Sequence, residues 1–83
     1  MSKKEQFHFI GIGGIGMSGL ARILLKKDAA ISGSDLHPSY VTEGLSHAGA
    51  KIYFGHAEEN VPDHSTVIYS SDIKKDNPEL LAA

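Results

Sequence analysis

The stretch that decides the fold is Gly11-Ile12-Gly13-Gly14-Ile15-Gly16. The segment before it, Phe7 to Ile10, is aromatic and β-branched and predicts a short buried strand. The segment after it predicts a helix from Ile15 to Lys27. The expected apolar stripe of this helix comprises Met17, Leu20, Ala21 and Leu24, and its polar face comprises Ser18, Arg22 and Lys26. A glycine-rich turn between a strand and a helix is typical of loops that bind phosphates.

The glycines of this G-x-G-x-x-G pattern have separate predicted roles. Gly11 permits the tight turn, Gly13 lets phosphates approach the backbone, and Gly16 lets the helix pack closely on the strand. The free N–H groups at the start of the helix would face the phosphates, and the helix dipole favours negative charge there. The loop is therefore predicted to bind a diphosphate.

The composition indicates one small globular domain. The chain has 83 residues, of which 41% are hydrophobic and 22% charged, and its net charge is −2. This charge indicates neither a nucleic-acid partner nor a membrane surface, and the lack of cysteine excludes disulfides and thiolate metal sites. Residues 1–6 are polar and are expected to form a flexible lead-in rather than a signal peptide. We expect a cytoplasmic domain without a membrane span.

The rest of the chain alternates between strand and helix patterns. The predicted segments are a strand over 29–33 that ends at Ser34-Asp35, a helix over 38–48 that starts at Pro38 and closes at Gly49, and strands over 51–54 and 66–69. The last strand is apolar enough to be buried on both faces. A final helix starts with Asn77 as its N-cap and Pro78 at its first position.

This alternation predicts an α/β fold with a parallel sheet of about four strands. Right-handed crossovers and a ligand loop after the first strand predict the strand order 3-2-1-4, which is a Rossmann-like three-layer half of a doubly wound fold. The ends of strands one, two and four would bring Gly11, Asp35 and Ser70 to one edge. Ligands of open α/β sheets bind at that edge.

The loop alone leaves more than one ligand open. Asp35 lies nineteen residues beyond Gly16, near the place where an acidic residue binds a ribose in dinucleotide folds, although it could also cap a turn before Pro38. Met17 stands where an ATP-binding loop has its lysine, so ATP hydrolysis is not predicted. The spacing separates neither NAD nor FAD from a nucleotide-diphosphate sugar. A pure interaction module, in which the loop is only a turn, is disfavoured by the four glycines.

The block from His8 to Ala21 resembles the N-terminal signature of the Mur ligase family. Similar blocks follow at Ser32-Gly33-Ser34-Asp35, Gly55-His56, Ser70-Ser71 with Ile73, and Asn77-Pro78-Glu79. The resemblance covers Phe7 to Ala83. It implies that residues 7–83 are the UDP-sugar-binding N-terminal domain of a longer cytoplasmic ligase of peptidoglycan synthesis. The main alternative is an NAD(H)-binding domain of a dehydrogenase or regulatory protein.

The resemblance also implies an activity for the whole ligase. Its N-terminal domain would hold the UDP part of UDP-N-acetylmuramate, and the central and C-terminal domains in cis would bind ATP, Mg²⁺ and L-alanine. The lactyl carboxylate would be phosphorylated to an acyl phosphate, which the amine of L-alanine attacks. This chain would need no cofactor of its own, would bind no metal and would not be catalytic alone.

The resemblance assigns site residues by position. The backbone of Ile12, Gly13, Gly14, Ile15, Gly16 and Met17 would hold the diphosphate, Asp35 would lie towards the uridine, and His56, Ser70 and Ser71 would close the other side. Two positions depart from the family pattern. Asp72 stands where a small neutral residue is expected, and Asp28-Ala29 replaces a glycine-containing turn. His8 is expected to be an ordinary sheet residue.

Overall fold

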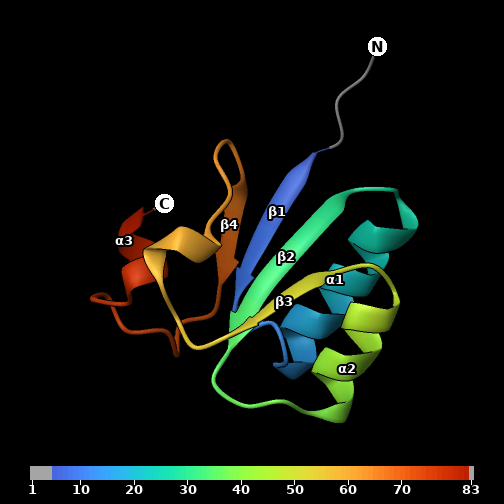
Figure 1. Ribbon diagram of the computed structural model, residues 1–83, viewed down its shortest axis with the longest axis horizontal. Helices are drawn as coiled ribbons and strands as arrows, with labels where there is room; N and C mark the ends of the chain where they lie inside the picture. Colours follow the sequence, from blue (N-terminus) through green and yellow to red (C-terminus); the bar gives the residue numbers. More distant parts are fainter. Residues whose placement is uncertain (1–4, 83) are drawn as a thin grey trace.

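The four strands form one parallel sheet in the order β3-β2-β1-β4, as the sequence predicts (Figure 1). The computed structural model describes residues 5–82. Its elements are β1 Gln6–Ile10, α1 Ile15–Lys26, β2 Ala30–Asp35, α2 Tyr40–His47, β3 Lys51–Phe54, the 3₁₀ turn η1 Glu58–Asn60, β4 Thr66–Tyr69 and α3 Pro78–Ala82. β1 begins one residue earlier than predicted, and residues 1–4 of the expected lead-in lie outside the described residues.

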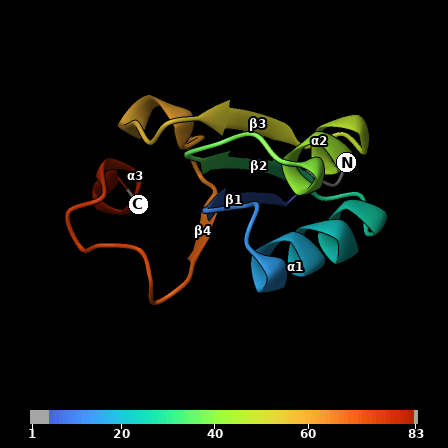
Figure 2. The ribbon, with the colours of Figure 1, turned by 90° about the horizontal axis from the view of Figure 1, so that it is seen from below.

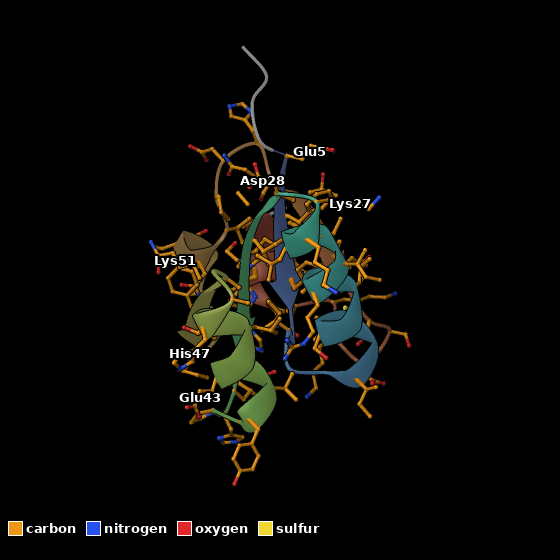
Figure 3. All side chains as sticks on the ribbon, turned by 90° about the vertical axis from the view of Figure 1, so that its right-hand side faces the viewer. Glu5, Lys27, Asp28, Glu43, His47 and Lys51 are labelled. Atoms are coloured by element: carbon orange, nitrogen blue, oxygen red, sulfur yellow. The ribbon has the colours of Figure 1, made fainter. Side chains whose placement is uncertain are left out.

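The sheet lies between two layers of helices, which gives the expected three-layer α/β arrangement. Helices α1 and α2 cover one face, and η1 and α3 lie on the other (Figure 2). Figure 3 looks onto the first face, where α1 and α2 stand in front of the sheet and Glu43 and His47 lie on the outer surface of α2. The hydrophobic core fills the space beneath these two helices.

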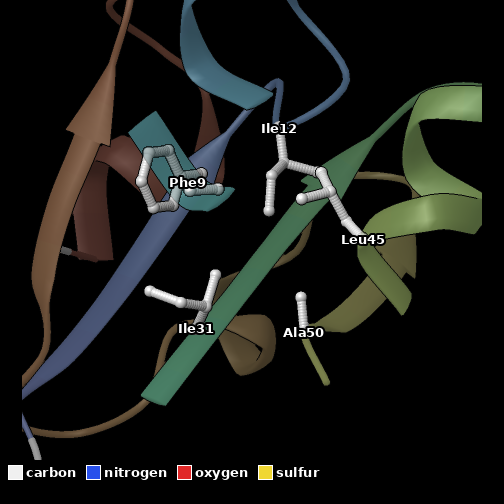
Figure 4. Packing of buried hydrophobic residues seen from close by; sticks show 6 residues of the cluster. Phe9, Ile12, Ile31, Leu45 and Ala50 are labelled. Carbon is white, nitrogen blue, oxygen red and sulfur yellow. The ribbon is translucent and has the colours of Figure 1, made fainter. Parts of the chain in front are cut away.

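Successive strand residues point to opposite faces, and this alternation separates an apolar layer from a polar one. Phe9 and Ile31 belong to the core beneath α1 and α2, together with Ile12 from the loop (Figure 4). On the opposite face, His8 of β1 and Ser34 of β2 are completely buried, although both are polar. His8, Phe9 and Ile10 are thus buried as predicted and Phe7 is half-buried, but only one face of the strand is purely hydrophobic.

Helix ends are set by identifiable caps. Asp28 adopts the predicted left-handed conformation after α1, with φ 65°, and Gly49 closes α2 with φ 113°. Asn77 caps α3 as predicted, because its Oδ1 accepts a hydrogen bond from the N–H of Glu79 at 2.9 Å. The predicted start of α2 at Pro38 was wrong. Ser39 and Thr42 form a reciprocal capping box, so the helix begins at Tyr40.

Three burial predictions were wrong. β4 is not buried on both faces: Tyr69 is 49% exposed, since β4 is an edge strand that pairs only with β1 among the described strands. In α1, Ser18 is buried and donates its hydroxyl to the carbonyl oxygen of Ile15 at 3.1 Å. Leu20, expected in the apolar stripe, is 39% exposed. The helix is rotated so that Ala21, rather than Leu20, faces the sheet.

The close approach of loop and sheet depends on Gly33, not on Gly16 as the sequence pattern predicts. A Cβ atom on Gly33 would lie 2.6 Å from Ile12 Cδ1 and 2.9 Å from the carbonyl oxygen of Phe9. Apart from its two chain neighbours and the backbone of its own helix, a Cβ atom on Gly16 would meet no described atom within 4 Å. The glycine that makes room for packing is therefore in the neighbouring strand, where the buried Ile12 side chain crosses it.

Candidate functional site

The glycine loop is fixed to the end of β2 by its own backbone. Gly11 turns with φ 78°, and the N–H groups of Gly11 and Ile12 both donate to the carbonyl oxygen of Ser34, at 2.8 and 2.9 Å. The N–H of Gly14 donates a hydrogen bond to the carbonyl oxygen of Gly11 at 3.0 Å. The turn is thus ordered by bonds within the protein before any ligand arrives.

Asp35 holds the same loop from the side. Its Oδ2 accepts a hydrogen bond from the N–H of Gly13 at 2.8 Å, and its Oδ1 accepts one from the N–H of Leu36 at 2.8 Å. A Cβ atom on Gly13 would lie 2.6 Å from Asp35 Oδ2 and 3.2 Å from Thr42 Cγ2. Gly13 therefore lacks a side chain because Asp35 and α2 occupy that space.

Three loop amides are left to bind an anion. The N–H groups of Ile15, Gly16 and Met17 form the first turn of α1 and have no acceptor within the described part of the chain, whereas the ladder of the helix begins with Ser18. Gly14, the N-cap, has no side chain to cap them, and the first turn carries no acidic residue. Gly16 is exposed, and so is the side chain of Ile15, at 95%. Open donors at the positive end of a helix suit a phosphate group.

A groove of about 480 Å³ lies at the same edge of the sheet. Leu36 after β2, His56 after β3, and Asp72, Ile73 and Asn77 from the segment between β4 and α3 contribute to its lining. Ile73 also reaches the loop, because its Cδ1 would be 3.6 Å from a Cβ atom on Gly11. The glycine loop and the groove are thus adjacent.

The remaining predicted residues lie at this edge but differ in exposure. Ser70 is half-buried and its carbonyl oxygen accepts a hydrogen bond from Ile73 at 3.1 Å, while Ser71 is exposed. Neither serine lines the groove, whereas the exposed Asp72 does. A larger cavity, of about 730 Å³, is lined by residues of α2 and β3 such as Tyr40 and Phe54 and contains none of the predicted site residues.

A buried polar cluster behind the groove was missed by the sequence analysis. Glu79 of α3 is fully buried, and its carboxylate accepts hydrogen bonds from His8 Nε2 at 2.5 Å, Ser34 Oγ at 2.7 Å, Asn60 Nδ2 at 2.9 Å and the N–H of Ala57 at 3.0 Å. Burial raises the pKa of Glu79, but these hydrogen bonds outweigh it and hold the pKa below its usual value. We define these residues together with His56 as the Glu79 cluster.

His8 and His56 contact this carboxylate from opposite sides. His8 is more than the ordinary sheet residue expected, because its Nδ1 also lies 2.7 Å from Ser32 Oγ. The side chain of His56 is 16% exposed, and its Nδ1 lies 2.8 Å from Ser34 Oγ and 3.4 Å from Glu79 Oε2. The sequence signal for this cluster was the placement of three polar residues, His8, Ser32 and Ser34, on one face of two strands whose other residues are typical of a hydrophobic core.

Neither a membrane-spanning helix nor a metal-binding group of side chains is found within residues 5–82. No helix within residues 5–82 is both long and apolar enough to cross a membrane. Within the same residues, no group of three or more histidine or acidic side chains is arranged to hold a metal ion.

The comparisons with known proteins agree on one family. A family model described as "Mur ligase family, catalytic domain" matches residues 6–83. The UDP-N-acetylmuramate–L-alanine ligase of Protochlamydia amoebophila is 64% identical over 80 residues, which cover 96% of this chain and 18% of that protein. The ligase of the same name from Aquifex aeolicus is 54% identical over 79 residues, which cover 95% of this chain and 17% of that protein.

A solved structure agrees with these sequence matches. The crystal structure of UDP-N-acetylmuramate-alanine ligase from Thermotoga maritima superimposes with a TM-score of 0.86 at 34% identity, covering 92% of this chain and 18% of that one. The chain thus spans just under a fifth of the length of the relatives it matches. With the family model matched over nearly all its residues, the chain belongs to the Mur ligase family.

Proposed function

We propose that this chain is the UDP-N-acetylmuramate-binding part of a cytoplasmic ligase that adds L-alanine to that substrate in peptidoglycan synthesis. The observation that carries the proposal is the set of three unpartnered amides, Ile15 to Met17, beside a groove at the carboxyl edge of a parallel sheet. The names of the relatives supply the substrate, because each of them is a UDP-N-acetylmuramate–L-alanine ligase.

The geometry supports a division of labour among the site residues. The amides of Ile15, Gly16 and Met17 bind the diphosphate, while Ile12, Gly13 and Gly14 shape the turn that presents them. Asp35 lies on the uridine side, and His56, Ser70 and Ser71 close the opposite side. Both carboxylate oxygens of Asp35 accept backbone hydrogen bonds, so Asp35 supports the loop, and each oxygen keeps a further lone pair for a ligand hydroxyl.

The described residues do not fit ATP and Mg²⁺. Met17 offers no cation at the position of the phosphate-binding lysine, and no group of three or more histidine or acidic side chains within residues 5–82 is arranged to hold a metal ion. We therefore assign ATP, Mg²⁺ and the amide-forming chemistry to the parts of the ligase that this chain does not span. Those parts act in cis, and this chain binds and orients the UDP-sugar.

A titration followed by amide NMR tests the proposal. UDP-N-acetylmuramate should shift the amide signals of Ile15, Gly16 and Met17 and those near His56, with the amides of residues 23–26 at the opposite end of α1 as an internal reference. UMP, which lacks the second phosphate, should bind more weakly than UDP. Saturable binding of NADH without any response to UDP or UDP-N-acetylmuramate would refute the proposal and favour a dinucleotide-binding domain.

A further inference from the structure

Ser34 lies between two partners that compete for its single proton. Its Oγ is 2.7 Å from Glu79 Oε1 and 2.8 Å from His56 Nδ1, and all three side chains come from different parts of the chain. Ser34 and Glu79 are completely buried, so water cannot supply an alternative donor or acceptor. The distribution of protons in this triad is therefore fixed by the three groups themselves.

The protons shared by Glu79, Ser34 and His56 determine which ring nitrogen of His56 is protonated. A carboxylate only accepts hydrogen bonds, so the Ser34 hydroxyl must donate to Glu79; the reverse orientation would place two oxygen lone pairs 2.7 Å apart. Ser34 Oγ can then only accept from His56, which requires a proton on Nδ1. The second oxygen of Glu79, 3.4 Å from Nδ1, favours the same arrangement.

The other ring nitrogen of His56 is open to the groove. His56 lines the groove, and its Nε2 has no hydrogen-bond partner among residues 5–82. Every buried side-chain nitrogen and oxygen atom of these residues has a partner, so Nε2 is not a buried atom. In the neutral ring with Nδ1 protonated, Nε2 carries a lone pair and acts as an acceptor.

We propose that Glu79, acting through Ser34, is a positioning residue that fixes His56 as its Nδ1-protonated tautomer, so that Nε2 accepts a hydrogen bond from a ligand hydroxyl or N–H group in the groove. The identity of that ligand rests on the proposed function. In a UDP-sugar the matching donors are the ribose and sugar hydroxyls and the uracil N–H, and the diphosphate offers none. His56 thereby selects a neutral donor, and the amides of α1 select the anion.

The charged groups around this triad are few. His8 on β1 contacts the same carboxylate from the other side, and Asp72, Lys74 and Asp76 line the groove with His56. Within residues 5–82, Asp72, Lys74 and Asp76 form no hydrogen bond or ion pair with Ser34 or His56. The tautomer is therefore set by Glu79 and Ser34.

The tautomer is measurable in the ligand-free chain. In ¹⁵N-labelled protein, at a pH where the ring is neutral, two-bond proton–nitrogen spectra should show His56 with Nδ1 protonated. Ser34→Ala should shift the population towards the Nε2-protonated form. Ser32→Ala is the matched control, because it also removes a buried hydroxyl from this face of β2. The Ser32 hydroxyl contacts His8 but not His56. An Nε2-protonated His56 in the unmodified chain overturns the inference, even if Ser34→Ala fails to fold.

Binding of UDP separates this inference from the proposed function. Ser34→Ala should bind UDP about fivefold more weakly, the size of one net hydrogen bond, and Ser32→Ala should bind it like the parent. Equal binding of UDP and equal binding of UDP-N-acetylmuramate in all three proteins overturns the role of Nε2 while leaving the proposed function intact. The expected tautomer without any UDP binding supports the positioning role of Glu79 and overturns the proposed function.

Discussion

Gly13 and Gly16 have opposite surroundings, although they belong to one loop. A side chain on Gly13 would collide with Asp35 and Thr42, whereas one on Gly16 would enter open space. The sequence pattern predicts the reverse, with Gly13 open to the ligand and Gly16 needed for packing. The motif thus identified the loop correctly, but the role of each glycine depends on which neighbour it meets.

Valine substitutions at the two glycines should therefore have different effects, one on stability and the other on UDP binding. Gly13→Val should destabilise the chain by about 1–3 kcal/mol, because the branched side chain overpacks against Asp35. Gly16→Val should leave the melting temperature nearly unchanged but weaken UDP binding, because the side chain stands at the exposed start of α1 next to the free amides. Melting curves and UDP titrations on both variants, beside the parent, check this. Full UDP binding by a folded Gly16→Val would contradict the assignment of the diphosphate to these amides.

Gly33 gives a second prediction at the scale of single residues. Gly33→Ala places Cβ 2.6 Å from Ile12 Cδ1 and 2.9 Å from a backbone oxygen, so it should cost about 1–3 kcal/mol of unfolding free energy. Gly19→Ala is the matched control, since Gly19 lies within α1 and its Cβ would meet no described atom within 4 Å apart from its chain neighbours and the backbone of its own helix. That change should stabilise the chain by about 0.5–1 kcal/mol. Equal denaturant midpoints for the two variants would show that loop and strand are not tightly packed at Gly33.

Periodicity and caps predicted the elements well. The strands and the Asn77 cap followed from the sequence because each depends on residues a few positions apart, and the strand order followed from the right-handed crossover rule. The errors arose where two local signals competed or where burial depended on distant neighbours. Pro38 is a good first helical residue, but the Ser39–Thr42 pair satisfies two backbone N–H donors, and the helix therefore begins after Ser39. β4 has the composition of a central strand, yet its place at the edge of the described sheet exposes it.

The capping box provides the test at the scale of elements. Ser39→Ala removes the oxygen that accepts a hydrogen bond from the N–H of Thr42 at 3.2 Å and should cost about 1 kcal/mol. Ser46→Ala, at an exposed position of the same helix, should change the stability by much less. Urea unfolding of both variants measures the difference. If Ser39→Ala costs no more than Ser46→Ala, the hydroxyl of Ser39 does not determine the start of α2.

At the scale of the whole molecule, the Glu79 cluster joins both ends of the described chain. His8 and Glu79 are 71 positions apart in sequence, and their contact ties α3 to the first strand. Neither periodicity nor motif spacing predicts such a contact, because it exists only once the sheet has brought β1 and β2 beneath α3. The same holds for the hydrogen bond from Gly13 to Asp35. The sequence therefore predicts where the candidate site lies, and the tertiary fold determines which groups remain free within it.

The Glu79 cluster also gives a pH dependence whose sign follows from the pKa of Glu79. Because that pKa is lower in the folded chain than its ordinary value of 4.5, the ionised carboxylate stabilises the fold above pH 4.5, and this contribution is lost as pH falls below it. His8 and His56 face the same carboxylate, from β1 and from the end of β3. Glu79→Gln should lower stability at pH 7 by about 1–3 kcal/mol, since the amide nitrogen cannot accept the hydrogen bonds of its donors.

The variant should also lose part of the acid sensitivity of the parent chain. Between pH 7 and pH 3.5 the free energy of unfolding should fall less steeply in Glu79→Gln than in the parent, because the group that takes up a proton on unfolding is gone. Glu59→Gln removes the same charge from an exposed position of η1 and should keep the slope of the parent. Urea unfolding at several pH values measures these slopes. Identical slopes in all three proteins would mean that folding does not shift the pKa of Glu79. A steeper fall in Glu79→Gln than in the parent would mean that this carboxyl group is protonated in the folded chain, and the proton count that assigns the tautomer of His56 would fail with it.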